Sequence, residues 1–323
     1  MKKIFVLIFL TAVFSADALE DLSFNIFQNR YAPKIDLEIG LGGLDVIETV
    51  YYDNLKDKAS DINYEMGAVF SLGFAVKLEP SDLFNKVGFT VGASTRHFFP
   101  KNSGHMSDGD WDEDGRELSW GESPASLLSG MENSGFLGIV IPINKKIAID
   151  LCAQITHKRY TVMAYNGYVK QEGNTADLYG PTMQYFQNWV MLGAKAGGRF
   201  KIGPALLSAD VLILPYAKGV NTDYHFFRKV KMPYETGYYD EKYISFQDKI
   251  DDGFYIGFEA EVKFSIGKKT YVSLFGMFDN ITEAKGSSRL RTVGVGDYDV
   301  WDSDGAGAGT KGNRFGVRIG AEL

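Results

Sequence analysis

Apolar and polar residues alternate one by one over unusually long stretches of this chain. From Tyr64 to Leu78 every even-numbered position is apolar, and the odd-numbered positions are small or polar except for Val69. Successive side chains of a β-strand point to opposite faces, so this period of two predicts a strand with one apolar face. The segments 35–42 and 256–266 repeat the pattern, with charged residues at several of their polar positions.

A transmembrane β-barrel satisfies both phases of this alternation. Apolar side chains face lipid, and the charged ones face a polar interior where they meet water or each other. The sequence therefore predicts an all-β fold, a ten-stranded antiparallel transmembrane β-barrel. The predicted strands lie near 35–52, 61–78, 87–99, 134–143, 146–165, 183–201, 205–220, 253–266, 270–284 and 313–323. An even number of strands is typical of single-chain bacterial barrels.

The predicted connections alternate in length. Most of one set are turns of two or three residues, and the other set spans 53–60, 100–133, 166–182, 221–252 and 285–312. Outer-membrane barrels have short periplasmic turns and long external loops, so all five long loops are expected on the outer side. A secreted β-sandwich is the alternative, but its strands are typically ~5–6 residues, about half the length of many predicted here.

The N-terminus and the overall composition fit an exported protein. Two lysines precede an apolar run at 4–14, and Ala16 and Ala18 follow it, which is the pattern of a secretory signal peptide. We therefore expect a signal peptide at 1–18 and a single barrel at 19–323. Cys152 is the only cysteine, which excludes an intramolecular disulfide. The 34 basic and 41 acidic residues give a net charge of −7, which provides no support for nucleic-acid binding.

Four histidines are the candidates for proton transfer near neutral pH. His97 and His157 continue the apolar phase of their strands, and His105 lies in a polar segment. His225 lies at the outer end of the seventh predicted strand, two residues after Asp223. Residues two apart share one face of a strand, so this carboxylate is in position to orient the imidazole.

An acidic segment follows the third predicted strand, with the sequence GHMSDGDWDEDG at 104–115. If the strand extends this far, Asp108 and Asp110 lie side by side, and such a pair of carboxylates can hold a water molecule between them. The competing interpretation is calcium, because 110–115 matches the opening of an EF-hand loop. The glutamate required at the twelfth position of such a loop is Gly121 here.

The two motifs, Asp108-Gly109-Asp110 and Asp223-Tyr224-His225, fall on the same external side of the predicted barrel. In this respect the chain resembles the omptin family, ten-stranded outer-membrane endopeptidases that pair an Asp-x-Asp in the second external loop with an Asp-x-His in the fourth. The segments ETVYY at 48–52, MQYFQNWVMLGAKAG at 183–197 and YVSLFGMFDNITEAKGSS at 271–288 are similar to omptin segments in the same order. The likeness runs from about residue 35 to the C-terminus.

The resemblance implies an aspartic-type endopeptidase that uses no metal or cofactor. His225, oriented by Asp223, would activate a water molecule held with Asp108 and Asp110, and that water would attack the peptide carbonyl. Omptins favour basic residues at the cleavage site because acids line their specificity pocket. Glu48 matches one of these acids, whereas a second is replaced by Asn221, which weakens the expected preference for Lys or Arg.

The resemblance also implies a lipid contact and a location. Arg159 matches the arginine with which omptins hold lipopolysaccharide, but Ile155 and His157 replace its aromatic and acidic partners. The implied location is the bacterial outer membrane with the site facing the exterior, and the implied partners are peptide or protein substrates and outer-membrane lipid. We expect a monomer. The alternatives are a catalytically silent barrel acting as an adhesin, a calcium-stabilised surface scaffold, and a small pore.

Overall fold

In the computed structural model, residues 31–52, 57–233, 239–293 and 299–323 are described, with the side chains of 227–243 and 290–304 excepted. The signal peptide expected at 1–18 lies outside these residues. Among them, no helix is long and apolar enough to cross a membrane. The described residues form thirteen strands in one sheet: β1 (Tyr31–Tyr51), β2 (Lys58–Pro80), β3 (Gly88–Phe98), β4 (Lys101–Trp111), β5 (Glu117–Asn144), β6 (Ile147–Tyr165), β7 (Tyr168–Gln171), β8 (Asn174–Asp177), β9 (Pro181–Ile202), β10 (Ala205–Pro233), β11 (Tyr239–Ser265), β12 (Thr270–Val293) and β13 (Asp299–Glu322).

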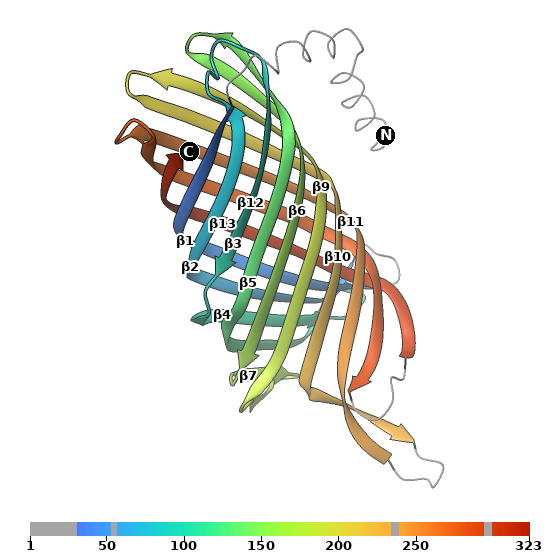
Figure 1. Cartoon of the computed structure of the whole chain (residues 1–323). Helices are drawn as coiled ribbons and strands as arrows, with labels where there is room; N and C mark the ends of the chain where they lie inside the picture. Colours follow the sequence, from blue (N-terminus) through green and yellow to red (C-terminus); the bar gives the residue numbers. More distant parts are fainter. Residues whose placement is uncertain (1–30, 53–56, 234–238, 294–298) are drawn as a thin grey trace.

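The sheet closes on itself as a tilted barrel (Figure 1), because β1 pairs with both β2 and β13. Strands β3 and β4 each pair with β2 and β5 and together occupy one place in the ring. The described strands thus form a ring of ten, which confirms the predicted fold. The break between β3 and β4 falls at Phe99 and Pro100, since proline has no N–H to donate to a ladder. The short strands β7 and β8 form a hairpin attached to β5.

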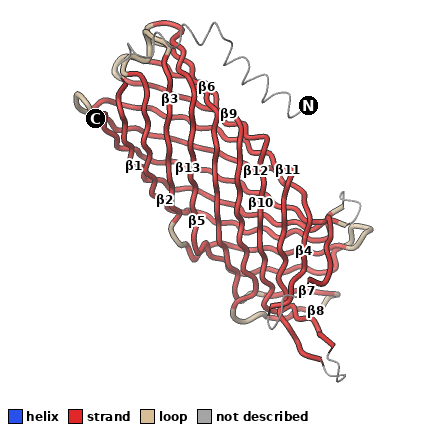
Figure 2. Tube along the Cα trace, turned by 45° about the vertical axis from the view of Figure 1, so that its right-hand side comes forward, coloured by secondary structure: helices blue, strands red, loops and turns tan. Residues whose placement is uncertain are grey.

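The prediction of long irregular loops is wrong for most of their length. The segments 100–133, 221–252 and 285–312 are largely strand, and the irregular connections of the described residues lie at the two ends of the barrel, apart from the break at Phe99 and Pro100 (Figure 2). Lipid imposes the strict alternation that marks a strand in the sequence, and it acts only within the membrane. Beyond the membrane both faces tolerate polar side chains while backbone pairing continues, so these extensions have no such signature.

An apolar belt covers the outer face of the barrel's middle section. Its side chains come from the predicted lipid-facing phase and are at least 38% exposed; they include Leu37, Ile39 and Leu41 of β1, Phe70, Leu72 and Phe74 of β2, and Phe315, Val317 and Ile319 of β13. A continuous exposed apolar surface of this extent requires an apolar environment. The belt is the lipid-facing surface.

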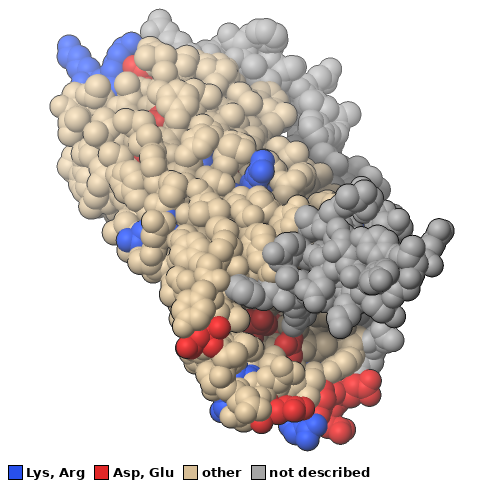
Figure 3. Space-filling view, turned by 90° about the horizontal axis from the view of Figure 1, so that it is seen from below, with Lys and Arg blue, Asp and Glu red and all other residues tan. Residues whose placement is uncertain are grey.

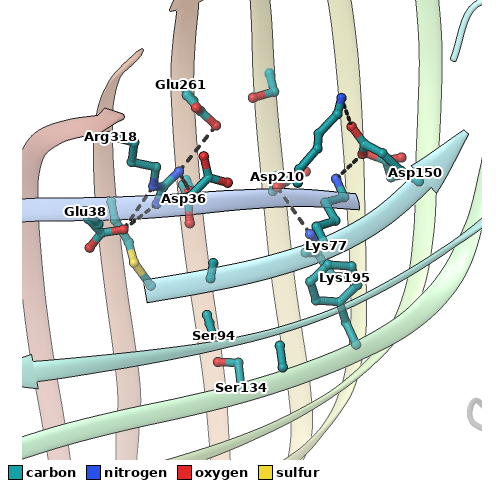
Figure 4. A pocket seen from close by; sticks show the side chains of 18 of the residues that line it. Asp36, Glu38, Lys77, Ser94, Ser134, Asp150, Lys195, Asp210, Glu261 and Arg318 are labelled. Atoms are coloured by element: carbon teal, nitrogen blue, oxygen red, sulfur yellow. Dashed lines mark hydrogen bonds and ion pairs between the residues drawn. The ribbon is translucent and has the colours of Figure 1, made fainter. Parts of the chain in front are cut away.

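The interior at the level of this belt is charged and internally paired. It contains a cavity of about 180 Å³ lined by acidic and basic side chains (Figure 4). Across it, Arg318 lies 2.8 Å from Glu38, and Lys195 lies 3.5 Å from Asp210. None of the candidate catalytic residues lines this cavity. These ion pairs stabilise the part of the lumen within the membrane. The candidate catalytic residues lie elsewhere, at one end of the barrel.

Candidate active site

The candidate residues lie at one end of the barrel, which we call the extended end. There the strands continue beyond the apolar belt, and β4 and β7 are found there, opposite the C-terminus (Figure 1). Seen from that end, Asp and Glu side chains gather over one part of the surface (Figure 3). The six predicted catalytic and substrate-binding residues all lie on strand extensions of this end, none in an irregular loop.

His225 and Asp223 form a buried pair on β10. Their side chains share the inward face of the strand, and Nε2 of His225 contacts Oδ2 of Asp223. Asp223 is 0% and His225 6% exposed. The ring of Phe246 on β11 packs edge-on against the imidazole, with 5.3 Å between ring centroids. The imidazole is thus held between a carboxylate and an aromatic ring.

The other three histidines, all in described segments, face away from this site. His97 is exposed on the outer face of β3. His157 also lies on the outer face, where its Nε2 is 2.6 Å from Oδ1 of Asn188. His105 is half exposed, 3.7 Å from Glu122. Only His225 therefore combines burial with a carboxylate partner.

Asp108 and Asp110 extend from the inward face of β4, on the wall opposite β10 in the ring. Oγ of Ser119 donates a hydrogen bond of 2.6 Å to Oδ2 of Asp110. Ile62 of β2 pairs with Glu48 on one side and Asp108 on the other. With strands ~4.8 Å apart, the Cα atoms of Glu48 and Asp108 are about 10 Å apart. The acid pair and Glu48 therefore line one continuous wall.

Two stacked tyrosines connect this wall to β10. The rings of Tyr64 on β2 and Tyr185 on β9 lie 6.2 Å apart and nearly parallel, at 11°. Burial, and after it the charges of Asp223, Glu48 and Asp108, hold the pKa of Tyr64 well above its usual value. The Tyr64 ring is therefore close to carboxylates from three strands, β10, β1 and β4. The motifs that are far apart in the sequence converge on one site.

The acidic segment after Asp110 forms a tight turn. Oδ1 of Asp112 accepts hydrogen bonds from the backbone N–H groups of Asp114 at 3.1 Å and Arg116 at 2.8 Å, and the Arg116 guanidinium lies 3.1 Å from Oδ2. Gly115 takes the left-handed conformation that the turn requires, with φ of 78°. In the described residues, no group of three or more metal-ligating side chains is assembled. Asp112 stabilises this turn through its contacts with Asp114 and Arg116.

The remaining predicted residues occupy different faces. Asn221 is fully buried on the inward face of β10, where its Oδ1 accepts a hydrogen bond of 3.3 Å from the backbone N–H of Asn188. Arg159 is exposed on the outer face of β6, next to buried Lys158. Arg159 therefore projects away from the lumen on the outer surface, on the same side as the belt.

Residues that the sequence did not single out also line the site. Tyr64, Tyr185, Gln187 and Asp248 are all buried on inward faces of β2, β9 and β11. Tyr185 and Gln187 follow the inward phase of a recognisable strand, so the alternation pattern indicates their direction. Tyr64 belongs to the phase that was predicted to face lipid, and that prediction is wrong for it. Ala68 has a φ of 54° and the register with β1 shifts between Gly42 and Leu44, so the phase reverses there and Tyr64 faces inward at 0% exposure. Asp248 lies in the segment 221–252 that was expected to be a loop, and no sequence signal indicated it.

A closed ten-stranded barrel with a lipid-facing belt and an acid-lined polar end is a transmembrane β-barrel of the outer-membrane class. The family model described as "Omptin family" matches residues 31–321. The chain belongs to the omptin family. It is an outer-membrane peptidase of that family and lies in the bacterial outer membrane.

Among solved structures, the outer membrane protease OmpT from Escherichia coli matches with a TM-score of 0.75 and 16% identity, over 90% of this chain and 97% of that chain. At this identity the match shows the fold alone. The toluene transporter TodX from P. putida (TM-score 0.33, 7% identity, 90% of each chain) and the outer membrane protein OprG from Pseudomonas aeruginosa (TM-score 0.32, 9% identity, 92% of this chain and 99% of that one) are much less similar. No curated protein sequence matches the chain.

Proposed function

We propose that the extended end faces the cell exterior and carries an endopeptidase site in which His225 is the general base. Asp223 orients the imidazole and stabilises its protonated form. Asp108 and Asp110, on the opposite wall, hold the water molecule from which His225 removes a proton. The resulting hydroxide attacks the peptide carbonyl, and the proton then passes to the leaving amine.

The observation that carries this proposal is the buried contact between His225 and Asp223 in an otherwise acidic site. Asp223 alone is sufficient to stabilise the buried imidazole of His225, so this pair does not require the two further carboxylates, Asp108 and Asp110, across the lumen. Asp108 nevertheless acts on the same Tyr64 ring as Asp223. Opposed groups of this kind leave between them the space in which water and a scissile carbonyl would meet.

Substrates are proposed to be peptides or proteins at the cell surface, with a preference for Lys or Arg at the cleavage site. Glu48 supports this preference because it is 2% exposed and lies on the same wall as Asp108. Asn221 contributes no charge. Arg159 is proposed to contact outer-membrane lipid, since its side chain projects from the outer face of β6.

The test is the turnover of His225→Ala, and of Asp108→Asn combined with Asp110→Asn, on a mixed peptide library in detergent. We expect each variant to lose about two orders of magnitude in kcat, as is typical for removal of a general base or its water. Heat-modifiable mobility on gels verifies that the variants are folded. Chelators are expected to leave turnover unchanged. Undiminished cleavage by His225→Ala, or activity abolished by chelation and restored by calcium, would contradict this mechanism.

A further inference from the structure

A buried carboxylate that the mechanism does not use lies beside the catalytic pair. Asp248 on β11 is 2% exposed, and its neighbours in register are Asn221 on β10 and Ser288 on β12. No Lys or Arg nitrogen of the described side chains lies within ion-pair distance of it. Burial raises the pKa of the Asp248 carboxyl to about 7, a rise that the Ser288 hydrogen bond and His225 oppose and Asp223 increases. A buried carboxylate is costly to charge without a cation, and among the described side chains Asp248 has none beside it.

A hydrogen-bonded bridge crosses the barrel near the level of this carboxylate. Nε2 of Gln187 on β9 reaches across the barrel and donates hydrogen bonds to the backbone oxygens of Ile47 at 2.8 Å and Gly309 at 3.2 Å. Gln187 lies beside Asn221 in the sheet, since the next pair outward is Phe186 with Thr222. The amide therefore links the level of Asn221 on one wall to Ile47, the residue preceding Glu48, on the other.

Glu48 and Asp248 both act on Tyr185. Burial, and then the charges of Glu48 and Asp248, hold the pKa of Tyr185 well above its usual value. Tyr185 and Tyr64 stack there and supply flat aromatic surface. Two buried polar atoms in the same region, Nδ2 of Asn221 and the hydroxyl of Tyr64, have no hydrogen-bond partner in the structure. Unsatisfied polar atoms of this kind indicate a site built for a polar guest.

We propose that Asp248 and Glu48 together form the subsite for one cationic side chain of the peptide substrate, with Asp248 supplying from β11 the charge that Asn221 lacks. The inference rests on the proposed endopeptidase function. A Lys or Arg side chain would pass between the catalytic walls, lie along the Tyr64 and Tyr185 rings, and end between the two carboxylates above Gln187. Asp248 is thus a specificity-determining residue and takes no part in proton transfer to the scissile bond.

The test uses two fluorogenic peptides that differ only in having Arg or citrulline before the scissile bond, because citrulline preserves the shape of Arg without its charge. Cleavage by the whole barrel in detergent is measured for wild type, Asp248→Asn, and Asp248→Asn combined with Asn221→Asp. We expect wild type to favour the Arg peptide in kcat/KM, and Asp248→Asn to lower that ratio by about tenfold. Cleavage of the citrulline peptide should stay within about threefold. The double variant should restore the ratio by moving the carboxylate to the neighbouring strand.

The matched control is Asp251→Asn, the same chemical change three residues further along β11. Asp251 is exposed and pairs with Lys218 at 2.9 Å, so this variant should leave the ratio unchanged. An unchanged ratio in Asp248→Asn, or an equal loss on both peptides, would overturn the proposal. Failure of the catalytic mechanism would be distinct, since His225→Ala would then cleave normally while the ratio still depended on Asp248.

Direct binding provides a second measurement that does not require turnover. The probe is p-aminobenzamidine, a small aromatic cation, titrated into the folded barrel and followed by its fluorescence. Binding to wild type that is weakened about tenfold or more in Asp248→Asn, and unaffected in Asp251→Asn, supports the subsite. Absence of binding to wild type, or equal binding to Asp248→Asn, overturns it.

Discussion

At the scale of single residues, burial distinguishes the candidate catalytic groups from chemically identical ones elsewhere in the chain. His225 is enclosed with Asp223, whereas His97 and His157 lie on the outer face of the barrel. A low-dielectric surrounding strengthens the interaction of an imidazolium with its carboxylate. The same residue type therefore has a different role according to which face of which strand carries it.

Glu48 provides a residue-scale prediction on specificity. A cation ~4 Å from a carboxylate gains about 4 kcal/mol at an effective dielectric of ~20, before desolvation is subtracted. We expect Glu48→Gln to remove most of the preference for Lys or Arg, and Asn221→Asp to increase it by about tenfold, or about 1.4 kcal/mol. Profiling with a peptide library measures both. A profile unchanged by Glu48→Gln would exclude Glu48 from the substrate pocket.

The raised pKa of Asp248 predicts a pH-dependent preference. A carboxyl group with a pKa of about 7 is neutral below that pH and charged above it, so its attraction for a cation grows as the pH rises through 7. The ratio of Arg to citrulline cleavage should therefore increase from pH 6 to pH 8, as measured in kcat/KM.

The ratio isolates this effect from the other titratable groups that face Asp248. These are Asp223 and His225 on β10 and Tyr185 on β9, and they act on both peptides alike. In Asp248→Asn the ratio should be flat over the same range. A wild-type ratio that does not vary with pH would contradict the prediction.

At the scale of one strand, successive side chains of β6 point to opposite faces, so two neighbouring basic residues lie in different surroundings. Lys158 faces inward at 0% exposure, 2.7 Å from Asp279 and 3.3 Å from Glu132, and its neighbour Arg159 faces outward. Removing one partner of a buried ion pair costs about 3–5 kcal/mol, because the remaining charges lose their compensation. Adjacent positions on one strand thus contribute very differently to stability.

We therefore expect Lys158→Met to lower the urea midpoint of unfolding in detergent markedly. The nearby Arg314, 3.7 Å from Glu132, offers partial compensation, so the loss should fall at the lower end of that range. Arg159→Met is the control and should change stability by less than about 0.5 kcal/mol, as is usual for surface substitutions. Equal midpoints for the two variants would contradict the inward placement of Lys158.

At the scale of the whole molecule, the apolar belt determines where the protein is found. The belt requires a bilayer, and the closed ring of strands resists unfolding by detergent alone. We expect the protein to fractionate with outer membranes and to change mobility on gels after heating. Recovery as a soluble periplasmic protein that shows no heat-modifiable band would contradict the membrane assignment.

The sequence by itself determined the membrane-spanning part of the fold and two of the motifs. Alternation recurs wherever lipid acts on one face of a strand, so the number of strands in the ring and the inward or outward direction of residues such as Leu72 were readable directly. The Asp-x-Asp and Asp-x-His motifs were readable because residues two apart share a face. Neither inference required knowledge of which strands are neighbours.

Only the tertiary structure decided how far the strands extend and what lies across the lumen. Beyond the membrane neither face of a strand contacts lipid, so apolar and polar residues need not alternate. Strands β10 and β11 therefore continue through 221–252 without that signature in the sequence. The placement of Asp248 beside Asn221 depends on the register between two strands, and the hydrogen bond from Gln187 to Ile47 across the barrel depends on closure of the ring. Both are relations between distant segments that no local spacing encodes.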